Sequence, residues 1–344
     1  MAHEIDQGTL TQVQMIGEPI MLFRDENGRA RALEDRCCHR FAPLSKGRLE
    51  ADGNIRCLYH CLKFSSDGRC TEIPGQDIIP DAAFVPAYEV EERHGWLWIW
   101  MGDKNNADRS LIPPAVGPDD PRYIMRPGRM DYEANYELIN DNLTDFSHLS
   151  YVHSASFGAS ESWADERPVV RRIDRGIRVT RWVGGSDKSP VNDDAPEALR
   201  SGLSPETALF QTYDYLAPGI LTMLSQVLPI ELMPDDRGPP DAAVVPIMET
   251  FTSQAVTPID DKHSRYFFAF GPWAKAGDEA ADQIYEVTKL AFSEDKEIIE
   301  AQQRIINLKP GREVMTSADV GPAQMRSVIR KLIKSETAYE VTSQ

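Results

Sequence analysis

Hydrophobic and polar positions divide the chain into two parts. In the first third, the short segments EPIMLFRD and ARALED flank the turn residues ENG, and the strand-like runs NIRCLYHCLKFSS and YEVEERHGWLWIWMG follow. This pattern predicts a small antiparallel β domain over residues 1–115. The stretch RSLIPPAVGPDDPRY, which is rich in Pro and Asp, then predicts a linker.

The rest of the chain, residues 116–344, mixes both kinds of periodicity. HSRYFFAFGPW is typical of a strand, and a long pattern at helical spacing predicts a helix from about residue 281 to about residue 305. A polar, turn-rich segment at residues 184–206 predicts a mobile surface loop. We therefore expect a second domain that contains both helices and strands.

Composition and charge limit the class of protein, its partners and its compartment. At 344 residues the chain is long enough for two cores, and 41% hydrophobic with 26% charged residues is ordinary for a globular protein. The net charge of −17 argues against nucleic acid or an anionic membrane as a partner. The start MAHEIDQGTLTQ lacks the basic and apolar regions of a signal peptide, and GWLWIWMG is far shorter than the roughly 20 residues of a membrane span. We therefore expect a cytoplasmic protein.

All five cysteines lie in one stretch, which points to metal rather than to a disulfide framework. Cys37-x-His39 is followed by Cys57-x2-His60, so two short loops each offer one thiolate and one imidazole. Such a set suits tetrahedral zinc, or an iron–sulfur cluster with two Cys on one iron and two His on the other. Alternation of Cys and His in both loops favours the cluster. Cys70 is expected to be a small buried hydrophobic residue.

A second group of metal-binding residues lies in DNLTDFSHLSYVH. Asp141, Asp145 and His148 are separated by four and three positions, which predicts that they share one helical face. His148 and His153 are five residues apart, about 140° around an ideal helix. They can bind one metal only if the helix ends or bulges between them.

The segment AFSEDKEIIEAQQ supplies a third ligand. At helical spacing, one mostly apolar stripe contains Ala291, Asp295, Ile298, Ile299 and Gln302. Three acids are expected to point towards solvent, namely Glu294, Glu297 and Glu300. A buried carboxylate needs a cation, so we predict that Asp295 joins His148 and His153 around iron(II), although pairing of Asp295 with an Arg is an alternative.

Both metal-binding regions resemble a known family. CCHRFAPLSKGRL and CLYHCLKFSSDGRC are similar to the two boxes of Rieske proteins, with Leu58 in place of the usual Pro and Cys61 in place of the usual Gly. With DNLTDFSHLSYVH and FSEDKEIIEAQQ, essentially the full chain resembles the oxygenase (alpha) component of a Rieske non-haem iron oxygenase, in the vanillate O-demethylase and dicamba O-demethylase group.

The resemblance implies an α+β fold: a small antiparallel β Rieske domain followed by a helix-grip (START-like) catalytic domain. It implies a [2Fe–2S] cluster and a mononuclear Fe(II), and a head-to-tail homotrimer in which the cluster of one subunit faces the iron of the next. Asp145 would bridge His60 of the neighbouring chain to His148, and Asn142 would lie near the iron.

The implied activity is that of a terminal oxygenase, a monooxygenase or demethylase of aromatic catabolism that uses O2. Electrons would come from NAD(P)H through a separate reductase, a ferredoxin or both, because the chain has no Gly-x-Gly-x-x-Gly fingerprint. The pocket is expected to draw on residues from about Tyr213 to Tyr285, with Gln254 and Tyr285 as candidate contacts for a small aromatic or other apolar substrate. Hydroxylation, O-demethylation and N-dealkylation remain open.

Two other functions are compatible with parts of the pattern. A stand-alone Rieske electron carrier needs no second iron, and His148, His153 and Asp295 count against it. A zinc-ribbon binding module would be colourless.

Overall fold

The computed structural model describes residues 1–154, 156–157, 162–184 and 203–342. Two compact units follow one another along the chain, Met1–Pro113 and Pro114–Gln344. The predicted linker begins just before this boundary. Of the predicted loop at 184–206, residues 185–202 lie outside the described part of the chain.

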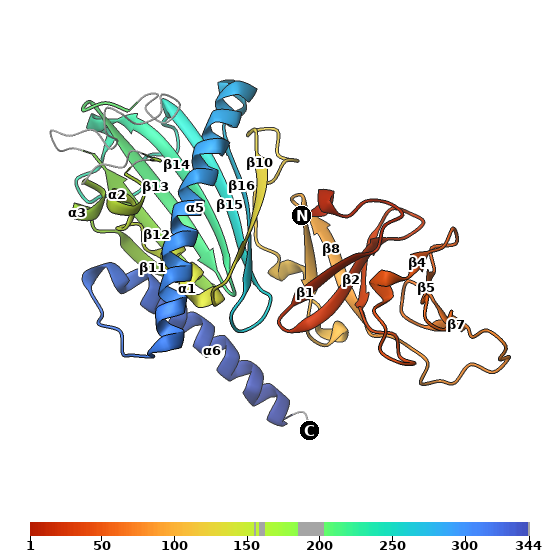
Figure 1. Cartoon of the computed structure of the whole chain (residues 1–344). Coiled ribbons are helices and arrows are strands. Elements are labelled where there is room, and N and C mark those ends of the chain that lie inside the picture. The colour runs from red at the N-terminus through yellow and green to blue at the C-terminus, as the bar shows by residue number, and fades with distance from the viewer. Residues whose placement is uncertain (155, 158–161, 185–202, 343–344) are drawn as a thin grey trace. The chain divides into compact units, whose positions relative to one another are not determined.

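The first unit consists of two antiparallel sheets (Figure 1). The five-stranded sheet has the order β1-β2-β3-β8-β9, with β1 (Thr11–Met15), β2 (Glu18–Arg24), β3 (Ala30–Glu34), β8 (Ala87–Arg93) and β9 (Trp96–Trp100). The four-stranded sheet has the order β4-β5-β6-β7, with β4 (Arg48–Leu49), β5 (Ile55–Arg56), β6 (Lys63–Phe64) and β7 (Cys70–Glu72).

Residues from both sheets of this unit form its core. Met21 and Phe23 of β2 and Leu33 of β3 point into it, and Phe64 joins them from β6. Ile20 and Leu22 alternate with Met21 and Phe23 and belong to a second cluster, so β2 is buried on both faces. Cys70 belongs to the same buried cluster, which confirms its predicted role as a small hydrophobic residue.

The second unit is built on one antiparallel sheet of seven strands in the order β10-β16-β15-β14-β13-β12-β11. The strands are β10 (Arg126–Tyr132), β11 (Val169–Ile173), β12 (Gly176–Val183), β13 (Thr207–Leu216), β14 (Ile220–Pro229), β15 (Met248–Pro258) and β16 (Ser264–Pro272). The helices are α1 (Tyr136–Thr144), α2 (Leu149–Val152), α3 (Ser162–Asp165), α5 (Asp278–Leu308) and α6 (Val320–Thr342).

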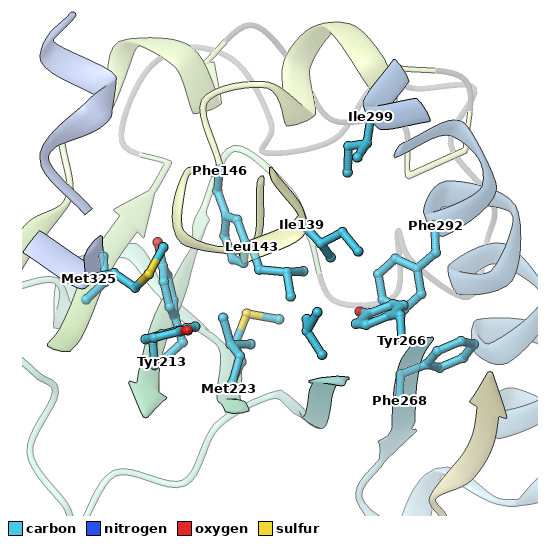
Figure 2. Packing of buried hydrophobic residues seen from close by; sticks show 14 of the residues in the cluster. Ile139, Leu143, Phe146, Tyr213, Met223, Tyr266, Phe268, Phe292, Ile299 and Met325 are labelled. Atoms are coloured by element: carbon cyan, nitrogen blue, oxygen red, sulfur yellow. The ribbon is translucent and has the colours of Figure 1, made fainter. Parts of the chain in front are cut away.

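Helices cover one face of this sheet. In Figure 1, α5 crosses the face, and it contacts β16 and β10, while α6 contacts β12 and β11. The core between helices and sheet is rich in aromatic rings: Phe292 of α5 meets Tyr266 and Phe268 of β16, with ring centroids 5.2 and 4.9 Å apart (Figure 2). Aromatic pairs at this spacing pack favourably beyond their area alone. The long helix therefore has a fixed position on the sheet.

Helix α5 contains the predicted segment 281–305 and extends beyond it at both ends. Gly277, at φ 84°, is its N-cap residue, and Asp278 and Glu279 lie in the first turn, where the helix dipole favours negative charge. Its buried residues are Ala281, Ile284, Thr288, Ala291, Phe292, Asp295, Ile299 and Gln303. The prediction that Ile298 and Gln302 face inward was wrong, because each lies about 100° around the helix from its buried neighbour.

None of the helices in the described ranges combines the length and the apolar character needed to cross a bilayer.

Candidate active site

The two Cys–His loops of the first unit have the same local geometry. The amide of Cys37 donates to the carbonyl of Ala42, and the amide of Cys57 donates to that of Leu62. Four residues after each cysteine the backbone has a positive φ, 59° at Phe41 and 58° at Cys61. An L side chain is strained in this region, which explains why a Gly is favourable at position 61. Cys61 adopts the turn nevertheless.

The four predicted cluster ligands lie at the tips of these loops. Cys37 and Cys57 are each only 2% exposed, whereas His39 and His60 are exposed, with ring centroids 4.4 Å apart. Burial and the neighbouring Cys57 raise the pKa of Cys37 to about 12. Buried thiols of this kind ionise only beside a cation. An arrangement with sulfur inside and imidazole outside fits a cluster held by two Cys on one iron and two His on the other.

A network of charges supports the second loop. Arg56 donates to the carbonyl of Cys61 at 2.9 Å and pairs with Glu50 and Glu72. Lys63 also pairs with Glu50. Side-chain hydrogen bonds from Arg56, Lys63 and Arg48 lower the pKa of Glu50 to about 2. The strained backbone at Cys61 is thus tied to the β4–β5 hairpin.

In the second unit, α2 and α5 bring His148, His153 and Asp295 together. Each offers one ligand atom, and all three atoms lie within 4.8 Å of one another. Oδ1 of Asp295 is 3.1 Å from Nε2 of His153 and 3.4 Å from Nε2 of His148. Two imidazoles and one carboxylate on a common face are the donor set of non-haem iron(II). The residues present therefore fit a mononuclear iron.

His148 and His153 are the N-cap and C-cap residues of the short helix α2, which therefore ends before it reaches His153, as binding of one metal by both histidines requires. A separate break precedes His148, because helix α1 stops at Thr144 and Asp145 has extended φ and ψ. The carboxylate of Asp145 accepts the amide and the hydroxyl of Ser147 at 2.8 and 2.9 Å. Such local side-chain bonds compete with helix formation. The prediction that Asp141, Asp145 and His148 share one helical face was therefore wrong.

Electrostatics in this cluster favour an ionised carboxylate. Burial alone would raise the pKa of Asp295, but hydrogen bonds and charge from His148 and His153 lower it to about 2. Burial would lower the pKa of His153, but Asp295 and Glu294 hold it above its usual value. Among the described residues, Asp295 is paired with His148 and His153 and not with the arginine that was the alternative.

The side chains of Asn142 and Glu294 hold the three candidate ligands in place. Nδ2 of Asn142 donates to Oδ1 of Asp295 at 2.9 Å and lies 3.3 Å from Nε2 of His148. Oε2 of Glu294 is 2.9 Å from Nδ1 of His153 and accepts the hydroxyl of Ser156 at 2.6 Å. The prediction that Glu294 points to solvent was wrong: at the edge of the buried stripe it reaches the histidine. Glu297 is exposed as predicted.

The metal-binding residues open into a cavity of about 160 Å³ between helices and sheet. A cavity of about 150 Å³ admits benzene, so this one suits a single aromatic ring. Its lining is mostly apolar, with the polar side chains Gln211, Ser225, Thr250 and Gln254 on the sheet. Sequence analysis missed Gln211 and Ser225, because other polar residues lie directly beside them in the same strands, Thr212 in β13 and Gln226 in β14.

The two predicted substrate contacts have different positions. Gln254 is only 3% exposed and lines the cavity, and its Oε1 has no hydrogen-bond partner. Tyr285 is not part of the lining, and its hydroxyl donates to the carbonyl of Pro127 at 3.0 Å. Because packing against Phe268 and this bond occupy the Tyr285 side chain, we no longer assign it to substrate.

Comparisons with known proteins cover both units. The Rieske [2Fe-2S] domain matches residues 1–88, and the vanillate O-demethylase oxygenase C-terminal domain matches residues 132–335. The chain is 37% identical to the toluene-4-sulfonate monooxygenase system iron–sulfur subunit of Comamonas testosteroni, over 97% of this chain and 94% of the relative. It is 32% identical to a vanillate O-demethylase oxygenase subunit of a Pseudomonas species, over 94% and 96%.

Solved structures agree with these matches. Dicamba monooxygenase bound to 3,6-dichlorosalicylic acid superposes with a TM-score of 0.85 at 26% identity, and the same protein with non-heme iron and dicamba superposes with a TM-score of 0.77 at 25% identity. Both alignments cover 98% of this chain and 96% of the other. They confirm the predicted α+β fold, with a small antiparallel β domain followed by the second domain.

Proposed function

This chain belongs to the oxygenase components of the Rieske non-haem iron oxygenases, and we propose that it oxidises a small aromatic compound in the cavity beside His148, His153 and Asp295. As a member of this family it is an oxidoreductase, a monooxygenase or demethylase, with a [2Fe–2S] cluster and a mononuclear iron. Relatives of this kind work in multi-component systems, so separate proteins supply the electrons. A stand-alone electron carrier or a zinc ribbon is not favoured.

We assign the metal ligands residue by residue. Cys37 and Cys57 hold the buried side of the cluster, and His39 and His60 hold its exposed side. His148, His153 and Asp295 hold the mononuclear iron. A bound iron would supply the open coordination positions needed to activate dioxygen, and a bound cluster would supply single electrons.

The protein's own residues keep this site in order. Asn142 donates a hydrogen bond to Asp295, which keeps the carboxylate turned towards the two histidines. Glu294 accepts the Nδ1 proton of His153, so the Nε2 lone pair is free for metal. The apolar lining excludes water from the substrate ring.

The observation that supports an aromatic substrate best is the size and lining of the cavity. Phe146, Phe157, Trp163, Phe270 and Phe292 all line it, and its volume matches one ring. The relatives named for toluene-4-sulfonate and vanillate also act on single-ring compounds. We propose hydroxylation of a methyl group or O-demethylation of a methoxy group on such a ring, with Gln254 as one contact.

We also propose that the chain forms a head-to-tail homotrimer, in the cytoplasm, with a ferredoxin or reductase linked to NAD(P)H as partner. The exposed position of His39 and His60 supports docking at the cluster. In this arrangement Asp145 joins His148 to His60 of a neighbouring chain.

Purified protein tests the proposed function directly. We expect a red-brown protein with about three irons and about two sulfides per chain, which reduces O2 and releases an oxidised product when given a reductase and a suitable ring compound. A colourless protein, or one whose reduced, iron-loaded form oxidises none of a panel of methyl- and methoxy-substituted aromatic compounds, would contradict the proposal.

A further inference from the structure

The C-terminal helix, α6, packs directly on the last turn of α1. Met325 of α6 is fully buried in the same core cluster as Leu143 of α1 (Figure 2). Gly321, in the first turn of α6, lies so close to α1 that a Cβ atom on it would be only 2.5 Å from the carbonyl oxygen of Thr144. A larger residue at position 321 would force the two helices apart. The backbones of α1 and α6 are therefore in contact where α1 ends.

An ion pair joins the same two helices. Nε of Arg326 donates to Oδ1 of Asp141 at 2.9 Å, and Nη2 donates to Oδ2 of the same carboxylate. Nη1 of Arg326 donates to the carboxylate of Glu313 at 3.1 Å. Two parallel bonds from a planar guanidinium fix the direction of a carboxylate as well as its distance, which a lysine cannot do. The pair therefore sets the orientation of Asp141 relative to α6.

Asp141 belongs to the turn that presents Asn142 to the candidate iron site. The carbonyl of Asp141 accepts the amide of Asp145 at 3.1 Å, so this residue closes the end of α1. The next residue, Asn142, donates to Asp295 and lies 3.3 Å from Nε2 of His148. A shift of Asp141 would therefore move the side chain that keeps two of the candidate ligands aligned.

Helix α1 needs support from outside its own sequence. It has only nine residues, and a helix of this length is marginal in water without tertiary packing. Asn142 lies in its last turn, and the ends of helices fray first. Apolar packing of Met325 stabilises the helix, but such packing is non-directional. The pair between Asp141 and Arg326 adds the direction.

Stability alone does not explain this pair. Burial raises the pKa of Asp141 to about 6, even with the guanidinium of Arg326 beside it. When a charged pair is removed from water, the cost of desolvation offsets most of the attraction. The geometry that the pair imposes on α1 is therefore the better explanation for its presence.

We propose that Arg326 is a positioning residue for the iron site. Through Asp141 it holds the last turn of α1 in place. Asn142, on that turn, then keeps Asp295 turned towards His148. The inference rests on the proposed mononuclear iron and adds the C-terminal helix to the parts of the chain that determine the geometry of its ligands.

Substitutions at Arg326 test this role by iron binding, on full-length protein that keeps its cluster. Arg326→Gln removes the charge, and Arg326→Lys keeps the charge but loses the two parallel bonds. We expect each to weaken Fe(II) binding by about tenfold in competition with a chelator, the lower end of the range for residues that support metal ligands. If Arg326→Gln does not fold, Arg326→Lys serves alone, because it retains the apolar stem and the charge.

A spectroscopic measurement reports the geometry itself. With the cluster oxidised, the electron paramagnetic resonance signal of the nitric oxide complex of the iron depends on the arrangement of ligands around the metal. We expect this signal to change in both Arg326 variants. Arg330→Gln is the matched control, because Arg330 is exposed one turn further along α6. It should leave both the iron affinity and the signal as in the original protein.

A double-mutant cycle shows whether Arg326 acts through Asn142. Asn142→Ala removes the side chain through which Arg326 would act. In that background Arg326→Gln should change the Fe(II) affinity by less than about twofold, because the effects of residues that act through one another are not additive. A tenfold loss that persists in Asn142→Ala would overturn the inference. Arg326 variants with a lower melting temperature but an unchanged affinity and signal would also overturn it, because the pair would then be structural only.

Turnover is measured separately from iron binding, so the proposed function can fail independently. If the iron-loaded original protein oxidises no ring compound, the proposed function is refuted, while an effect of Arg326 on iron binding through Asn142 stands. If the original protein oxidises a ring compound but Arg326→Gln binds iron normally, only the role of Arg326 is refuted. The two failures are therefore distinguishable.

Discussion

The carboxylate of Glu294 and the imidazole of His153 lie 2.9 Å apart, on the side of the ring opposite to Asp295. Two successive residues of α5 thus contact the two nitrogens of one histidine, Glu294 at Nδ1 and Asp295 at Nε2. A carboxylate on the far nitrogen fixes the tautomer and orientation of a metal-binding histidine and increases its basicity.

Glu294→Ala should therefore weaken iron binding by about ten- to a hundredfold, in the range seen when such supporting carboxylates are removed. Competition with a chelator on protein whose mononuclear iron has been removed measures the affinity, and the visible spectrum of the cluster should not change. Glu297→Ala is the control, because Glu297 is exposed three residues further along the same helix. Equal iron affinity in both variants would show that Glu294 is not a positioning residue.

The residues on the inward face of α5 could be predicted from the sequence only in part. Spacing correctly selected Asp295, because a carboxylate at the centre of an apolar stripe is conspicuous. Spacing placed Glu294 in solvent, because this residue lies at the edge of the stripe. Its partner, His153, is 141 positions away in the sequence. Helical periodicity contains no information about such distant partners.

The short connection before His148 illustrates the same limit. A step of four and three residues predicted one continuous helix through Asp145, but Asp145 instead binds Ser147 and ends α1. The cavity residues Gln211 and Ser225 were missed for another reason. Strand register, which brings Gln211 beside Ser225, depends on pairing between segments and on connections that local patterns do not specify.

Removal of the mononuclear iron should destabilise the second unit. Free Fe(II) at about a hundred times its dissociation constant stabilises a protein by about 2.7 kcal/mol if it binds only the folded state. We expect this gain in melting experiments on the original protein and its loss in Asp295→Asn, which keeps the shape and the bond from Asn142 but removes the charge. An iron-dependent gain that persists in Asp295→Asn would place the metal elsewhere.

The charge network around the second cluster loop predicts a dependence of stability on pH. The pKa of Glu50 is lowered from its usual 4.5 to about 2 by Arg56, Lys63 and Arg48. A lowered pKa in the folded state contributes stability that is present above pH 4.5 and is lost as the pH falls towards 2. Glu50→Gln should therefore lower the melting temperature at pH 7 and reduce its decline between pH 5 and pH 3.

Melting curves at several pH values, read from the cluster absorption, measure this effect. Asp77→Asn is a suitable control, because it removes an exposed carboxylate from the same unit. If the original protein and Glu50→Gln lose the same number of degrees between pH 5 and pH 3, Glu50 is not the group responsible.

The proposed bridge between subunits gives the most demanding prediction. Asp145 uses its carboxylate to accept two bonds from Ser147, and an Asn at this position can still accept the amide of Ser147. Asp145→Asn should therefore keep both metals but lose the charge that joins His148 to His60 of a neighbouring chain. We expect the cluster to reduce normally and electron passage to the iron to slow by at least about a hundredfold, as measured by rapid mixing of the reduced protein with oxygen and substrate.

Mixing two inactive chains then tests the trimer. In a mixed trimer of Asp145→Asn and His60→Cys chains, some interfaces pair an intact His60 with an intact Asp145, so part of the activity should return. Ser147→Ala is the control for local structure, because it removes one bond to Asp145 but leaves the carboxylate in place, and it should retain most of the activity. Mixed trimers that are verified by native mass spectrometry and remain inactive would mean that electrons travel within one chain. A protein that forms no trimer would remove the basis of the bridge altogether.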